Sequence, residues 1–442
     1  MFPSTNRPTA LPKGCLSHLW IGALLAAALF VATPLLVHAG DGDLDPTFGD
    51  GGKVITDFGR GDAHANAIAV QADGKIVAAG RAYRPSFGQD IALARYNLNG
   101  TLDNTFGVSG MLVTDFFGYR DEATALAVQA DGKLVVVGSA YKDNYYLCAL
   151  ARYNADGSLD MSFDTDGKVV LDIADTDGGE GGCNALVAQQ EGILLVAGWT
   201  KGSESQTLDF VLVRLNSDGS VDHTFGIDGR VVTDFSGNDD TVYALALQSD
   251  GKIIAVGGSY DAATELSYIA VTRYNPDGSL DFTFGSGGKT ITNLSGDVDA
   301  SGTGTAVTTQ PDSKIIVGGR NGGLGYNHVS ALVRYTSAGA LDPTFGVDGI
   351  VSPASARALV LQPDGKIIGA ISWKLHRYMP NGAFDPTFDT SDTDFWLDEV
   401  DAIAMQFDGK IVTAGGHGVF ALTRHKNFVP VGDPISLPLV DR

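Results

Sequence analysis

The sequence predicts an all-β fold, a single seven-bladed β-propeller, and two interleaved repeats carry this prediction. A phrase of the form LDxTFG, degenerate in some copies, begins at Leu44, Leu102, Leu159, Val221, Leu280, Leu341 and Phe384. A second phrase of the form QxDGK alternates with it and begins at Gln71, Gln129, Gln189, Gln248, Gln310, Gln362 and Gln406. A long period that runs through almost the whole chain is typical of repeat architectures, so it determines the fold class first.

Each unit contains four strand-like runs. In the first complete unit these are Ala67–Gln71, Lys75–Gly80, Ile91–Tyr96 and Met111–Phe116. Apolar and small residues alternate within the runs, and Asp-Gly between the first two runs is a strong signal for a tight hairpin turn. No segment shows a helical period longer than one turn. Four-stranded antiparallel units of this length, without helices, favour a propeller.

The two ends of the repeat region complement each other. Lys53–Phe58 reads as a fourth strand that has no preceding strands of its own, while the last unit ends after a third strand, Val419–His425. We therefore expect these two segments to pair and close the ring, which leaves no exposed sheet edge. The propeller is expected over residues 43–426, followed by an extended tail, 427–442.

The N-terminus, residues 1–39, predicts a secretory signal peptide. Arg7 and Lys13 precede the apolar run Leu19–Val37, and Ala39 is a small residue suited to cleavage. The alternative is an uncleaved anchor, because the run is close to membrane-spanning length. In both cases the remainder is exported, so we expect a secreted, periplasmic or cell-surface protein with no membrane contact after cleavage.

Composition limits the partners. The formal charge is −22, from 30 basic and 52 acidic residues. A chain this acidic repels phosphate backbones, so nucleic acid is excluded as an expected partner. We expect a monomer that binds a protein or a glycan.

The repeat units resemble those of the delta-60 repeat family of bacterial β-propeller proteins. Their pattern reads LDxTFG…AxAxQxDGKIxxxG…LxRYNxDG, and it covers about Asp43 to Lys426. The third unit departs most, with Gln189–Ile193 reading QQEGI, and the sixth has Ile371 where a glycine is usual. The resemblance implies a propeller and an extracellular setting. It implies no established activity and no catalytic residues.

One arginine recurs at the end of every third strand, eight residues before the aspartate of the next LDxTFG phrase. We interpret the pairs as a structural clamp across the connection between the third and fourth strands, since a catalytic pair would be needed only once. The seventh pair forms through ring closure. The expected pairs are Arg95 with Asp103, Arg152 with Asp160, Arg214 with Asp222, Arg273 with Asp281, Arg334 with Asp342, Arg377 with Asp385, and Arg424 with Asp45.

Function is expected where the units differ. In this strand order the QxDGK turns and the LDxTFG connections share one nearly uniform face, and the other two kinds of connection form a variable, acidic face. Clustered carboxylates there could bind calcium, although solvated surface charge is the competing interpretation. The candidate ligands are Asp175, Asp177, Asp239, Asp240, Asp297 and Asp299.

Two further features fall on this face. The loops between second and third strands are shortest in units six and seven, which places Trp373 and His417 beside a low wall that could form a ligand groove. Trp373 could equally be a packing residue. Cys148 and Cys183 lie in neighbouring blades, where they either form a disulfide or remain free thiols.

The sequence contains no P-loop, zinc-ligand spacing or nucleophile elbow. The favoured function is therefore an exported binding module that uses its variable acidic face. The alternatives are a propeller hydrolase or lyase with two carboxylates at the channel mouth, and a structural spacer.

Overall fold

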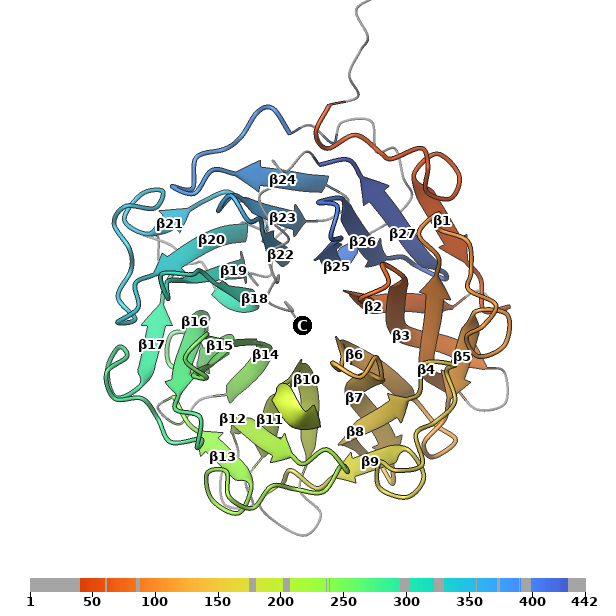
Figure 1. Cartoon of the computed structure of the whole chain (residues 1–442). Helices are drawn as coiled ribbons and strands as arrows, with labels where there is room; N and C mark the ends of the chain where they lie inside the picture. The colour runs from red at the N-terminus through yellow and green to blue at the C-terminus, as the bar shows by residue number, and fades with distance from the viewer. Residues whose placement is uncertain are drawn as a thin grey trace, which may run out of the picture. The chain divides into compact units, whose positions relative to one another are not determined.

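The computed structural model describes residues 40–59, 62–84, 88–174, 180–201, 207–235, 237, 239–294, 302–321, 330–354, 356–371, 374–388, 390 and 399–427. The chain divides into a unit Met1–His38 and a unit Ala39–Arg442, and every described residue belongs to the second. Within that unit, antiparallel sheets follow one another around a ring (Figure 1). The predicted seven-bladed propeller is confirmed.

In blades 1 to 6 the strands run from the axis outward in chain order, as the strand labels in Figure 1 show. Blades 1 to 3 comprise β2 (Ala63–Val70), β3 (Ile76–Arg84), β4 (Gly88–Tyr96) and β5 (Met111–Thr114); β6 (Asp121–Val128), β7 (Leu134–Lys142), β8 (Tyr145–Tyr153) and β9 (Lys168–Leu171); and β10 (Gly181–Ala188), β11 (Leu194–Lys201), β12 (Leu208–Leu215) and β13 (Arg230–Thr233). Blades 4 and 5 comprise β14 (Asp239–Leu247), β15 (Ile253–Asp261), β16 (Leu266–Tyr274) and β17 (Lys289–Thr292); and β18 (Gly302–Thr309), β19 (Ile315–Asn321), β20 (Ser330–Tyr335) and β21 (Ile350–Val351).

Blade 6 has three strands among the described residues, and residues 391–398, which follow its LDxTFG phrase, lie outside them. Its strands are β22 (Ala358–Leu361), β23 (Ile367–Ile371) and β24 (Lys374–Tyr378). Blade 7 combines β25 (Val400–Met405), β26 (Ile411–Gly415) and β27 (Phe420–His425) with β1 (Lys53–Thr56). A short 3-10 turn, η1 (Gln190–Gly192), replaces the standard QxDGK turn of unit three.

Ring closure occurs as predicted. β1 pairs antiparallel with β27, with Lys53 opposite Thr423 and Thr56 opposite Phe420. The contact extends beyond the expected bounds of the propeller. The guanidinium of Arg377 in blade 6 donates to the Asp41 carboxylate at 2.7 Å and to the Asn427 side-chain oxygen at 3.1 Å. One arginine thus holds the segments that precede the first strand and follow the last.

The hydrophobic core lies between neighbouring blades. Each cluster of buried apolar side chains combines residues from two adjacent sheets, as where Phe48 and Ala78 pack with Phe420 across the blade 7 to blade 1 junction. The phenylalanine of every LDxTFG phrase is at most 2% exposed, and burial of such a ring contributes about 1.5–3 kcal/mol. A buried hydroxyl bond adds a polar link across a junction, for example Tyr153 to Thr114 at 2.8 Å. The repeats therefore stabilise one another pairwise around the ring.

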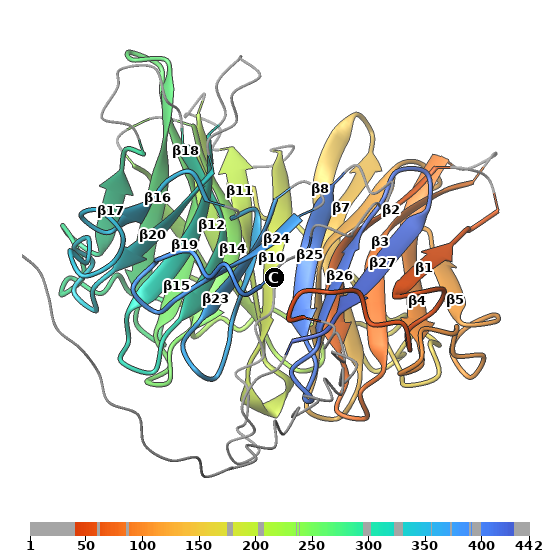
Figure 2. The same ribbon diagram turned by 90° about the horizontal axis from the view of Figure 1, so that it is seen from above.

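The ring has two faces, and Figure 2 shows it from the side, with the strands running between the two faces. Lys75 of the QxDGK turn lies 3.2 Å from Asp103 of the LDxTFG connection, so these phrases share the uniform face. On the opposite, variable face, the β7–β8 hairpin meets the connection from β5 to β6, where the rings of Tyr141 and Tyr119 are 6.3 Å apart. Within the described part of the chain, no helix has the length and apolar character needed to cross a membrane.

Candidate functional site

The arginine of every unit contacts its predicted aspartate at 2.7–2.9 Å. The structure adds two partners that the sequence pattern did not reveal. Except for Arg377, each guanidinium also donates to a backbone carbonyl of the next blade, as Arg95 does to Ala155. Outside unit three, the lysine of QxDGK approaches the same carboxylate, as Lys75 does at 3.2 Å from Asp103. The contact therefore joins two blades as well as two strands.

The clamp carboxylates are ionised over a wide pH range. Burial of Asp385 raises its pKa, but hydrogen bonds from the Thr387 hydroxyl and backbone and the charge of Arg377 outweigh it and lower the pKa to about 2. The clamp of unit three differs from the others in its surroundings. It has Ile193 in place of the lysine, and its clamp side chains are 15% and 13% exposed, compared with 6% and 5% in unit four.

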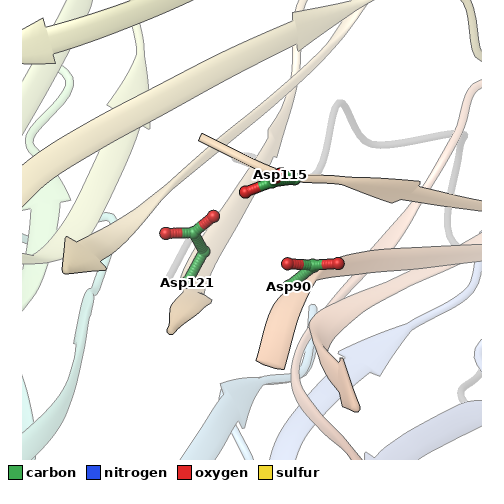
Figure 3. A group of neighbouring side chains, drawn as sticks. All are labelled: Asp90, Asp115 and Asp121. Atoms are coloured by element: carbon green, nitrogen blue, oxygen red, sulfur yellow. The ribbon is translucent and has the colours of Figure 1, made fainter. Parts of the chain in front are cut away.

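A different group of acids gathers on the variable face, where blade 1 passes into blade 2. Asp90 lies in β4, Asp115 directly follows β5, and Asp121 begins β6. One carboxylate oxygen of each lies within 4.8 Å of one from each of the others. Figure 3 shows the three carboxyl groups facing a common centre. We call Asp90, Asp115 and Asp121 the first acidic triad.

Two members of this triad are deeply buried. Asp90 and Asp121 are 0% exposed, and their Oδ1 atoms have no hydrogen-bond partner among the described residues. Asp121 Oδ2 accepts the Phe116 N–H at 2.7 Å, whereas Asp90 Oδ2 has no hydrogen bond among the described residues and lies 3.2 Å from the Arg84 guanidinium as an ion pair. An unpaired buried carboxylate oxygen is costly, so this arrangement calls for a ligand or a proton.

Burial is also the main influence on the protonation of these groups. It raises the pKa of Asp121 to about 7, and the neighbouring charges of Asp115 and Asp90 add to the rise. It raises the pKa of Asp90 to about 6, against the opposing charge of Arg84. Shifts of this size and direction mark the triad as a place where negative charge is concentrated without enough compensation.

The same arrangement recurs where blade 3 passes into blade 4. Asp209 in β12, Asp234 after β13 and Asp240 in β14 form the second acidic triad, again with ligand oxygens within 4.8 Å of one another. Asp240 is 0% exposed, and its Oδ2 accepts the Phe235 N–H at 2.6 Å. Burial raises the pKa of Asp240 to about 6, and the charges of Asp234 and Asp209 add to this, although Ser259 opposes it.

A sequence signal for the triads exists, but it appears only when one unit is aligned with the next. An aspartate five residues before the clamp arginine occurs in units one and three, as Asp90 and Asp209. In both cases the following unit has an aspartate eight residues before its QxDGK glutamine. The other five units have Leu147, Tyr268, Val329, Ser372 and Val419 at the first of these positions.

The structure regroups the predicted calcium ligands. Asp240 lies with Asp209 and Asp234, whereas Asp239 is exposed and its Oδ1 accepts the Leu208 N–H at 2.9 Å. The other four predicted ligands, Asp175, Asp177, Asp297 and Asp299, lie outside the described residues.

The structure describes one of the two residues of the predicted ligand groove. Trp373 lies outside the described residues. His417 is exposed in the short connection between β26 and β27. Two pockets found in the structure, of about 630 Å³ and 320 Å³, lie instead on the uniform face, beside Lys75 and Lys252 respectively.

Cys148 in β8 and Cys183 in β10 are joined by a disulfide, at a sequence separation of 35. Both are buried in the cluster between blades 2 and 3. The bond therefore links two neighbouring blades covalently.

Tyrosines are concentrated on the variable face beside the first triad. Tyr141 lies between Tyr119 and Tyr146, with ring centroids 6.3 Å and 5.1 Å away, and Tyr145 adjoins them in the β7–β8 hairpin. Tyr119, Tyr145 and Tyr146 are 59%, 42% and 38% exposed. We call these four residues the tyrosine group.

The ring of repeated blades defines the class of protein: the chain is a β-propeller repeat protein. Six segments match the family model described as a domain of unknown function (DUF5122) beta-propeller, at residues 71–106, 129–163, 189–225, 248–284, 310–345 and 362–388. A seventh match, to the WD domain G-beta repeat, covers residues 229–263. The sequence matches none of the curated proteins.

Solved structures resemble the chain in fold. The polysaccharide lyase Uly1 is 12% identical with a TM-score of 0.50, over 89% of this chain and 94% of that one. A virginiamycin B lyase from Staphylococcus aureus is 13% identical with a TM-score of 0.48, over 84% and 98%. Sqt1 from Chaetomium thermophilum, bound to the N-terminus of the ribosomal protein L10, is 12% identical with a TM-score of 0.45, over 84% and 98%. At these identities the likeness shows the fold alone.

Proposed function

We propose that the protein is an exported β-propeller of the delta-60 repeat type that binds a protein or glycan partner through its variable face. The observation that carries the proposal is the tyrosine group on the β7–β8 hairpin and the adjoining connection. Exposed tyrosines supply large, rigid contact area with a polar end, which is why they are enriched in binding surfaces. Loops on a rigid scaffold are the usual location of such surfaces.

Export is supported by two observations. Residues 1–39 have the charge and apolar pattern of a secretory signal, and the disulfide between Cys148 and Cys183 suits an oxidising compartment. The N-terminal residue of the protein purified from its native source tests this, since cleavage after Ala39 leaves Gly40 first. An intact N-terminus would support the retained anchor instead.

The binding surface is tested with a double variant, Tyr119→Ala and Tyr146→Ala. Central aromatic contacts commonly contribute more than 1.4 kcal/mol to binding, so we expect affinity for a glycan identified on an array to fall at least about tenfold. The matched control is Phe282→Ala, because Phe282 is 77% exposed on the uniform face. A protein partner is located by chemical crosslinking, with crosslinks expected on the β7–β8 hairpin.

Two results would contradict the assignment to the variable face. One is full affinity in the double tyrosine variant. The other is an equal loss in the control variant, or crosslinks that map to the QxDGK turns.

A lyase or hydrolase is the second candidate, because the acidic triads contain carboxyls with raised pKa values. Their geometry favours it less. Asp90 and Asp121 are 0% exposed, so a substrate cannot reach them in this arrangement, and general acids and bases must contact the reacting group. Release of reducing ends from a polysaccharide panel, lost in Asp121→Asn, would revive this candidate.

A further inference from the structure

We propose that each acidic triad is a divalent-cation site of the calcium class, held between two neighbouring blades. All three side chains of each triad offer oxygen only, which suits a hard cation and disfavours zinc or copper. The sites lie beneath the variable face and are distinct from the clamp aspartates of the uniform face.

The spacing fits one shared ion. Calcium binds oxygen at about 2.3–2.6 Å, so two oxygens on the same ion lie at most about 5 Å apart. The ligand atoms of each triad lie within 4.8 Å of one another. Calcium takes 6–8 oxygens, so bidentate carboxylates and water would complete the shell.

The unsatisfied atoms point to a ligand independently of the spacing. Asp121 Oδ1 and both carboxylate oxygens of Asp90 are buried without a hydrogen bond among the described residues. Asp115 Oδ1 accepts the Gly118 N–H at 2.6 Å, and Asp121 Oδ2 accepts the Phe116 N–H at 2.7 Å. The loop thus orients Asp115 and Asp121, while Asp121 Oδ1 has no hydrogen bond among the described residues and remains available to a ligand.

Two cationic side chains contact the first triad, and each does so at its edge, through one carboxylate or one backbone carbonyl. Arg84 approaches Asp90 at 3.2 Å, but its side chain is 43% exposed and is therefore partly screened by water. Lys168 donates to the Asp115 backbone carbonyl at 2.7 Å, and Lys289 donates in the same way to Asp234 in the second triad, at 2.9 Å. A divalent cation would supply the missing positive charge at the centre, and bound protons are the competing solution.

The same three-aspartate arrangement occurs at two blade junctions. Units one and three, where an aspartate stands five residues before the clamp arginine, are each followed by a unit with the matching first-strand aspartate. In both triads the third aspartate accepts a backbone N–H from the residue after the second one, the second aspartate accepts a glycine N–H, and a lysine donates to its backbone carbonyl. A shared ligand accounts for the aspartate at the first position being followed by one at the second in both units, although the second position also has an aspartate alone, Asp398 in unit seven.

The first site has a consequence that rests on the proposed function. The connection closed by Asp115 and Asp121 carries Tyr119, a member of the tyrosine group. An ion bound at the triad would fix this connection, so partner binding should weaken when calcium is removed.

The test is calorimetric titration of the purified full chain with calcium chloride after removal of metals by EDTA. We expect two calcium ions per chain and a melting temperature raised by a few degrees, since a ligand that binds only the folded state stabilises it. Magnesium should bind more weakly, because it demands rigid octahedral geometry. No partner is present in this titration, so its failure is distinguishable from failure of the proposed function.

Variants assign the sites. Asp121→Asn and Asp240→Asn should each leave one calcium ion per chain, and their combination none. Both should melt in EDTA no lower than the wild type, because each removes repulsion between buried carboxylates. The matched control is Asp172→Asn, because Asp172 occupies the position of Asp115 in unit two but has Leu147 and Gly181 at the partner positions. If Asp121→Asn does not fold, Asp90→Asn removes a ligand from the same site.

Two outcomes would overturn the proposal. One is the absence of binding up to about 10 mM calcium, above the dissociation constants of weak extracellular sites. The other is two calcium ions still bound in the variant that combines Asp121→Asn and Asp240→Asn, which would place the ions elsewhere.

Discussion

The clamp of unit four provides the sharpest test of the repeat architecture, through Arg273→Ala. Arg273 contacts Asp281 at 2.7 Å, donates to the Ser337 carbonyl of the next blade, and lies 4.8 Å from the centroid of the Phe284 ring. The pair is almost fully buried. Removing one partner of a buried ion pair costs about 3–5 kcal/mol, because the other charge remains without compensation.

Lys252 reduces this cost. Its ammonium lies 3.0 Å from the same Asp281 oxygen and remains after the substitution. The side chain of Lys252 is 27% exposed, so its interaction is partly screened and does not replace the lost bonds to Ser337. We therefore expect a loss near the lower end of the range, about 3 kcal/mol.

Unit three supplies the internal comparison. The clamp side chains of Arg214 and Asp222 are 15% and 13% exposed, so water can solvate the carboxylate when the arginine is removed. Arg214→Ala should cost about 1–2 kcal/mol, between the values for exposed and buried pairs.

Urea unfolding measures both costs, followed by circular dichroism and tryptophan fluorescence. The two signals must coincide for a single free energy of unfolding to be defined. An unchanged midpoint in Arg273→Ala would refute the buried clamp. A larger loss in Arg214→Ala than in Arg273→Ala would refute the reasoning from burial, and a negligible loss in Arg214→Ala would show that this pair does not act as a clamp.

Three further predictions concern the same ring. Asp385 has a pKa of about 2 in the folded state and about 3.9 when unfolded, so the unfolded chain takes up the proton first and stability falls between about pH 4 and pH 2; melting temperatures should decline across this range. Replacing Cys148 and Cys183 together with serine should cost about 2–4 kcal/mol, and wild-type protein under reducing conditions should match the variant in urea unfolding. Ile193→Lys restores the missing lysine to the clamp of unit three and should stabilise the fold by about 0–1 kcal/mol; a lower urea midpoint would show that the ammonium does not reach the carboxylate.

Much of the architecture could be predicted because each blade carries the same phrases in the sequence. Seven copies of LDxTFG and QxDGK determine blade number, and the orphan Lys53–Phe58 identifies the closing strand. The spacing of Arg95 and Asp103 indicates their contact because only a short connection separates Asp103 from the end of the strand that carries Arg95. These features can be recognised from residues that lie close together within one unit, or from one strand that has no pairing partner within its own unit.

The acidic triads could not be found in this way. Asp90 and Asp121 belong to different units, and each position is occupied by an apolar or small residue in several other units. The contact between them depends on how one blade packs against the next, which the register of a single repeat does not contain. The role of the QxDGK lysine was missed for a related reason, since the turn that carries it approaches the LDxTFG connection only after the blade has folded.

The closure of blade 7 sets the order in which the molecule can assemble. β1 finds its partner only in β27, so the beginning of the ring stays unpaired until the final strands have been made and delivered to the same compartment. Bringing such distant segments together is slow, because the chain must lose the entropy of a very long loop before any contact is gained. If the protein is exported as proposed, a folded ring cannot form midway through translocation. The chain would therefore cross the membrane before its ring is closed. A premature stop that removes β27 would leave β1 and the remaining strands of blade 7 with unpaired edges, to which other chains could pair.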